Sequence, residues 1–327
     1  MILSFASAMM ILLSMCGAIL GLSVAERALR IFRRWNISDQ ENRYELEKEF
    51  YLTYVTVGVV LGIRLFAIPL YFWTLESFVP MIPGAMCLWG VFNVIPQHCW
   101  PALSLKFLFP TIYVGWLILA KINDVSKRNP LIRNLMGLYL STLPLLVLDS
   151  LVDFSIFYNL QPIRVSCCAS AIDEWPRPVP ALVGGVAGQT LLLSTFLVLS
   201  SIYAILSFMS AGRRLFEWIS RSLTLILIPV TVLTITEVLT PWVLHLPLHH
   251  CPFCLLYKHP AAPIFLALLW ISFSGAWWAL ITERMGATNT ESRGTEMIFR
   301  QNIWRISGVT MLISLVMVTV FVLISFI

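Results

Sequence analysis

Charged side chains are scarce in this chain: Asp, Glu, Lys and Arg make up 12% of its 327 residues, against roughly a quarter in a soluble domain. Hydrophobic residues make up 58%. The longest polar stretch has about 25 residues, whereas an independent domain needs roughly 50. This composition excludes a soluble globular protein and predicts an integral membrane protein that contacts the lipid bilayer.

Several functional motifs are missing as well. There is no basic tail or RNA-binding motif, so nucleic acid is not expected as a partner. There is no Walker motif, so energy for any pumping has to come from a partner chain or an ion gradient. Leu255 rather than histidine follows Cys254, which excludes covalent attachment of a c-type haem.

What is present is a series of eight apolar segments, each long enough to cross the hydrocarbon core as a helix, which needs about 20 residues; the fifth is longer than a span needs. They are placed at 3–24, 51–73, 102–120, 135–157, 180–209, 219–244, 261–282 and 304–327. The first has no basic residue before it and no small-residue cleavage site after it, so a retained helix is expected. The predicted fold is all-α, a single polytopic helix bundle over 1–327.

Basic residues alternate between the two sides of this bundle. Of the 22 Lys and Arg residues, 17 follow the odd-numbered spans, and Arg64 lies within the second span. The other side receives only Lys106, Arg164, Arg177 and Lys258. The positive-inside rule therefore predicts that both termini are extracytoplasmic. The outer loops are then 74–101, 158–179 and 245–260, and the expected location is a bacterial inner membrane with these loops in the periplasm.

Thiols and imidazoles gather in the three outer loops. All five histidines and six of the seven cysteines lie there: His98, His245, His249, His250, His259, Cys87, Cys99, Cys167, Cys168, Cys251 and Cys254. Cys16 lies in the first span, where a thiol packs as a small apolar group. A protein that collects these groups at one membrane face is expected to use them there.

The sharpest motif is His249-His250-Cys251-Pro252-Phe253-Cys254. A CxxC holds two sulfurs within one turn of backbone, close enough for a small disulfide ring or a shared soft metal. The first hypothesis is redox chemistry, with nearby cationic groups stabilising a thiolate. The second is a Zn or Cu site built from His249, His250, Cys251 and Cys254.

The remaining outer cysteines leave the disulfide arrangement open. Adjacent Cys167 and Cys168 can bridge each other only through a strained ring, so each is expected to pair with another loop or to bind a soft metal. Cys87 and Cys99 can bridge each other within their own loop. A third alternative is that structural disulfides simply brace the loops in an oxidising compartment.

The string Cys251-Pro-Phe-Cys254-Leu-Leu resembles the CxxC of the vitamin K epoxide reductase and DsbB families, membrane thiol oxidoreductases that pass electrons between protein dithiols and a quinone. The resemblance covers six residues, and those families have a four-helix core. It implies that Cys251 or Cys254 attacks the disulfide of a thioredoxin-like or other extracytoplasmic protein. The other outer cysteines would act as the relay, and Arg64 or a Trp-rich outer pocket would hold the quinone.

Ionisable residues inside the spans are the other signal: Arg64, Asp149, Asp153 and Glu237. Each costs at least a few kcal/mol if unpaired at the bilayer centre. Asp149 and Asp153 are four residues apart and share one helix face, so Arg64 can pair with Asp149. Two interpretations stay open, a structural ion pair and a path for protons or substrate. The second belongs to a non-enzymatic permease or a membrane subunit of a larger complex.

Overall fold

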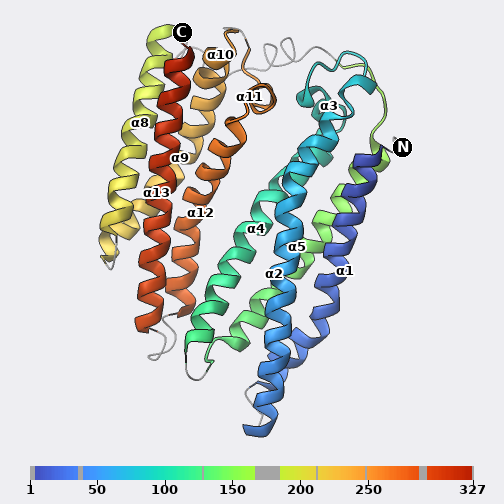
Figure 1. The fold of residues 1–327 in the computed structure, drawn as a ribbon, viewed down its shortest axis with the longest axis vertical. Helices are drawn as coiled ribbons and strands as arrows, with labels where there is room; N and C mark the ends of the chain where they lie inside the picture. The colour runs from blue at the N-terminus through green and yellow to red at the C-terminus, as the bar shows by residue number, and fades with distance from the viewer. Residues whose placement is uncertain are drawn as a thin grey trace. The chain divides into compact units, whose positions relative to one another are not determined.

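The computed structural model describes residues 4–35, 40–126, 129–165, 185–210, 213–246, 249–286 and 293–325. Within these ranges the regular secondary structure is entirely helical (Figure 1). Eight of the described helices are long and apolar enough to cross a membrane. The protein is therefore an all-α, multi-pass membrane protein that contacts the lipid bilayer, as the sequence predicts.

The helices, in chain order, are α1 (Phe5–Arg34), α2 (Gln40–Glu76), η1 (Val79–Met81), α3 (Leu88–Val94), α4 (Pro96–Val125), α5 (Ile132–Asn159), α8 (Val186–Met209), α9 (Arg214–Thr234), the π-helix η2 (Ile235–Leu239), α10 (Thr240–Val243), α11 (Pro252–Lys258), α12 (Ala262–Gly286) and α13 (Arg293–Ser325).

The observed helices extend beyond the predicted spans into polar sequence. α2 begins at Gln40 and α13 at Arg293, because hydropathy marks only the part of a helix that crosses lipid, whereas an established helix adds one backbone hydrogen bond for each further residue. The predicted outer loop 74–101 contains η1, α3 and the start of α4. Its prolines divide it into short pieces, as expected from the missing N–H groups.

The first of two compact units comprises Met1–Pro83, Gly90–Val165 and Ile281–Phe299. Here α1 packs against α2 and α5, and α4 also packs against α2 and α5 (Figure 1). The hydroxyl of Tyr139 on α5 donates to the carbonyl oxygen of Gly21 on α1, at 2.6 Å. A Cβ at Gly21 would collide with Leu146, so the glycine permits the close contact of α1 with α5.

The second unit comprises Gly84–Trp89, Ser166–Leu280 and Arg300–Ile327. The hydroxyl of Tyr203 on α8 lies 2.7 Å from Ser307 Oγ on α13 and 3.1 Å from the carbonyl oxygen of Ser272 on α12. A Cβ at Gly275 would lie only 2.7 Å from the Cβ of Ser307. Small and hydroxyl-bearing residues therefore hold these helices together, as is common in membranes. In this unit α10, α11 and the C-terminal end of α13 lie at one end (Figure 1).

Candidate functional site

The CxxC motif begins the short helix α11 in the second unit. Pro252 occupies the first helical position, where its fixed φ suits the helix and its missing N–H removes no bond. Cys251 precedes it with extended backbone, and the Cys254 N–H donates to the Cys251 carbonyl oxygen at 3.1 Å. This single turn brings the two thiols to the same end of α11.

A third thiol joins them from a distant part of the chain. Cys87, which precedes α3, places its Sγ atom 3.9 Å from the Sγ atom of Cys251. The Sγ atoms of Cys87, Cys251 and Cys254 all lie within 4.8 Å of one another. The Trp89 ring stacks on Phe253 with centroids 5.9 Å apart, which fixes the segment of Cys87 against α11. We call these three residues the thiol cluster.

The thiol cluster favours one thiolate. Hydrogen bonds from the thiols of Cys254 and Cys87 lower the pKa of Cys251 to about 4, although burial acts in the opposite direction. The same contacts raise the pKa of Cys254, because its proton is held by the Cys251 sulfur. Cys251 is 0% exposed, whereas Cys254 is partly exposed. Cys254 is therefore the residue of the cluster with the largest exposed fraction.

His250, the second histidine before the CxxC, contacts Glu237 and the backbone of Thr236. His250 Nδ1 lies 3.2 Å from Glu237 Oε2 and 3.2 Å from the carbonyl oxygen of Thr236. Glu237 belongs to the π-helix η2, and such turns are frequent at functional sites. Burial lowers the pKa of His249, and the charges of Lys258 and His250 act in the same direction. The compact set of ligand atoms is thus three sulfurs, with Cys87 where the sequence suggested histidine.

The other cysteines of the prediction are placed differently. Cys99 is buried on α4 in the first unit, and the Tyr71 hydroxyl donates to its carbonyl oxygen at 3.2 Å. Cys87 belongs to the second unit, so the two cysteines of the first outer loop are divided between the units. Cys167 and Cys168 lie outside the described residues, and their pairing or metal binding stays a prediction.

A buried charge network occupies the first unit. It consists of Arg64 on α2, Lys106 on α4, and Asp149 and Asp153 on α5, and none of these residues is more than 3% exposed. Arg64 Nη1 donates to Asp149 Oδ2 at 2.7 Å, which is the pair expected from the sequence. Lys106 Nζ lies 2.7 Å from Asp153 Oδ1 and 3.4 Å from Asp149 Oδ1. Two positive and two negative charges therefore balance.

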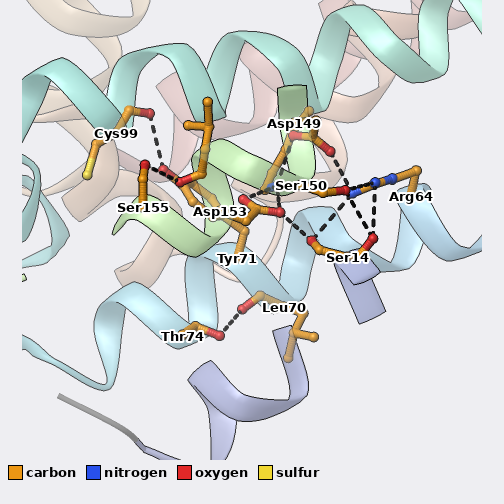
Figure 2. Close-up of polar contacts among 12 residues, drawn as sticks. Ser14, Arg64, Leu70, Tyr71, Thr74, Cys99, Asp149, Ser150, Asp153 and Ser155 are labelled. Carbon is orange, nitrogen blue, oxygen red and sulfur yellow. Dashed lines mark hydrogen bonds and ion pairs between the residues drawn. The ribbon is translucent and has the colours of Figure 1, made fainter. Parts of the chain in front are cut away.

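Serine side chains complete the network (Figure 2). Arg64 Nη2 donates to Ser150 Oγ at 2.6 Å and to the Ser14 carbonyl oxygen at 3.3 Å. The Ser14 hydroxyl on α1 donates to Asp153. Both terminal nitrogens of Arg64 thus donate to protein groups, so a quinone at Arg64 would have to compete with Asp149 and Ser150.

Sequence reasoning missed Lys106, Ser14 and Ser150. Lys106 was assigned to the outer side with the few basic residues there, whereas the structure buries it within α4. Its position inside an apolar segment was the available signal. The serines gave none, because single serines are ordinary in membrane helices and acquire meaning only through the residues that they face.

Comparison with known proteins identified no relative. No protein-family model, curated protein or solved structure matches the chain. The geometry of the thiol cluster and of the charge network is therefore the ground for assigning a function.

Proposed function

We propose that the protein binds a soft metal ion through Cys87, Cys251 and Cys254. The supporting observation is that the three Sγ atoms lie within 4.8 Å of one another. Two thiolates 3.9 Å apart, each about 2.3 Å from a shared ion, subtend an angle of about 115°. This angle is between the tetrahedral and the trigonal-planar values, so the sulfurs of Cys87 and Cys251 need little movement to share an ion.

The donor set favours Cu(I) over Zn(II). Thiolates select both ions against hard cations such as Mg²⁺ and Ca²⁺. Zn(II) usually takes four protein ligands in a structural site, and the described ligand atoms in this cluster number three. Cu(I) is satisfied by three sulfurs, whereas Zn(II) would need a water or a reoriented His249 as its fourth ligand.

Under the topology predicted by the basic residues, the thiol cluster faces the extracytoplasmic side, in a bacterium the periplasm. The partners in that case are a soluble protein that delivers or accepts the ion, or other membrane subunits. Partly exposed Cys254 is the sulfur that such a partner would meet first, and buried Cys251 would complete the transfer.

Anaerobic titration of the purified, reduced protein tests the proposal. We expect one equivalent of Cu(I) to be withdrawn from a chromophoric chelator, with binding lost in Cys87→Ser, Cys251→Ser and Cys254→Ser. Cys16→Ser and Cys99→Ser are the matched controls and should bind like the wild type. Undiminished binding by Cys87→Ser would contradict the three-sulfur site.

A second candidate, thiol–disulfide exchange, is favoured by the contact between the Cys87 and Cys251 sulfurs. The Cys251 thiolate would attack a substrate disulfide and form a mixed disulfide, releasing one substrate thiol. A second cluster thiol would then attack Cys251, releasing the other substrate thiol and closing a disulfide within the cluster. A membrane quinol would supply two electrons and two protons to reduce that disulfide again.

Thiol mapping by mass spectrometry distinguishes the two candidates. Exchange predicts a reversible disulfide between two of the three cysteines, and a trapped mixed disulfide at Cys251 when Cys87→Ser and Cys254→Ser are combined so that no second cluster thiol remains. Metal binding predicts three reduced thiols that the bound ion protects from alkylation.

A further inference from the structure

The charge network of the first unit is uneven in the way its two carboxylates are held. The Asp149 carboxylate pairs with Arg64 Nη1 at 2.7 Å and with Lys106 Nζ at 3.4 Å. The Asp153 carboxylate accepts hydrogen bonds from Lys106 Nζ at 2.7 and 2.9 Å. Among the described hydrogen bonds and ion pairs, it has no contact with an arginine. Arginine stays ionised in proteins, and its planar group is anchored here by Asp149, Ser150 and backbone. The part of the network able to change its charge is the pair of Lys106 and Asp153.

Both partners of that pair have an alternative contact already in place. If Asp153 gains a proton, Lys106 keeps a carboxylate within 3.4 Å, that of Asp149. Its ammonium also lies 5.0 Å from the centre of the Tyr71 ring, whose face favours a cation. The Asp153–Ser14 hydrogen bond can reverse, with the protonated carboxyl donating to the serine oxygen. Lys106 thus keeps a carboxylate partner, and the Asp153 carboxyl group keeps Ser14, after this change.

We propose that Asp153 is a proton-binding site within the membrane, and that Lys106 shifts its hydrogen bonds from Asp153 to Asp149 when the proton binds. One proton is added to a carboxylate oxygen, and the charge of the network changes from zero to plus one. The charged and titratable groups around Asp153 are Lys106 and Cys99 on α4, Arg64 and Tyr71 on α2, and Asp149 on α5.

This site is independent of the thiol cluster, which belongs to the other unit. A proton bound between α4 and α5 would let a proton gradient drive a rearrangement of these helices. That source of energy suits a sequence without a Walker motif. A purely structural network, in contrast, would keep all four charges at every pH at which the protein is folded.

Infrared difference spectroscopy on the full chain in lipid nanodiscs tests the proposal. On acidification from mildly alkaline to mildly acidic pH, we expect the carbonyl absorption of a protonated carboxylic acid shielded from water. The band should be lost in Asp153→Asn and retained in Glu237→Gln, which alters a carboxyl in another span. Absence of the band in the wild type, or its survival in Asp153→Asn, would overturn the proposal.

Thermal unfolding gives a second readout. Asparagine has the charge and nearly the shape of protonated aspartic acid, so Asp153→Asn should fold, with a midpoint close to that of the acidified wild type. Asp149→Asn should lower the midpoint far more, because Asp149 serves both cations. If Asp153→Asn fails to fold, or loses as much as Asp149→Asn, the neutral form is not tolerated and the proposal is wrong.

Discussion

The contact of α12 with α13 in the second unit leads to a sharp prediction for Gly275→Ala. A Cβ at this position would lie 2.7 Å from Ser307 Cβ and 3.0 Å from Ser307 Oγ, whereas carbon atoms pack at about 3.5–4.0 Å. Ser307 is not able to turn away easily, because its hydroxyl contacts Tyr203 and the Ser272 carbonyl oxygen, each at 2.7 Å. The added methyl group must therefore push the helices apart by roughly 1 Å.

The expected loss of stability follows from three contributions. Overpacking of this kind costs about 1–3 kcal/mol. Weakening the two hydrogen bonds of Ser307 costs about 0.6 kcal/mol each, the average for polar contacts between membrane helices. Alanine has a better helix propensity than glycine by about 1 kcal/mol, which offsets part of the loss. The net expectation is a free energy of unfolding lowered by roughly 1–3 kcal/mol.

Unfolding titrations with sodium dodecyl sulfate in mixed micelles, followed by circular dichroism, measure this change. Gly62→Ala is the matched control, because nothing lies within 4 Å of the Cβ it would add, and it should be neutral or stabilising. In the double variant Gly275→Ala with Ser307→Gly, the two effects should not add, with an interaction energy above about 0.5 kcal/mol. Equal stability of Gly275→Ala and Gly62→Ala, or strict additivity, would refute the reasoning.

Three further predictions concern other parts of the protein. Arg64→Lys keeps the charge but loses the planar group that contacts both Asp149 and Ser150, so the same titration should show a loss of about 1–3 kcal/mol; an unchanged protein would indicate a nonspecific charge contact. Trp116→Ala removes a 2% exposed ring whose Nε1 donates to a backbone carbonyl oxygen at 2.8 Å, and should lower the free energy of unfolding by about 3–5 kcal/mol; a stability equal to that of the wild type would argue against this core. Cys87 and Cys251 are buried, so a membrane-impermeant maleimide should label them much faster after unfolding than in the folded protein, as peptide mass spectrometry will show, and equal labelling rates would contradict this burial.

Much of the architecture can be read from hydropathy. A membrane helix needs about 20 apolar residues, and apolar runs of that length are visible without any tertiary contact. The Arg64–Asp149 pair was also within reach, because an unpaired charge in lipid is costly and few candidates exist in the spans. The ends of the helices could not be predicted in this way, since the polar turns of α2 and α13 carry no hydropathy signal.

The number and class of the spans, and the presence of thiols and buried charges, thus follow from the chain itself, because they depend on composition within short windows. Which of those residues lie next to one another in space does not follow from the sequence. Cys87 meets Cys251 across 164 positions of sequence, and Lys106 meets Asp153 across 47. Such contacts depend on how whole helices pack, and neither the CxxC spacing nor the hydropathy of α4 carries that information. Only the tertiary packing brings Cys87 next to the two cysteines of the CxxC motif.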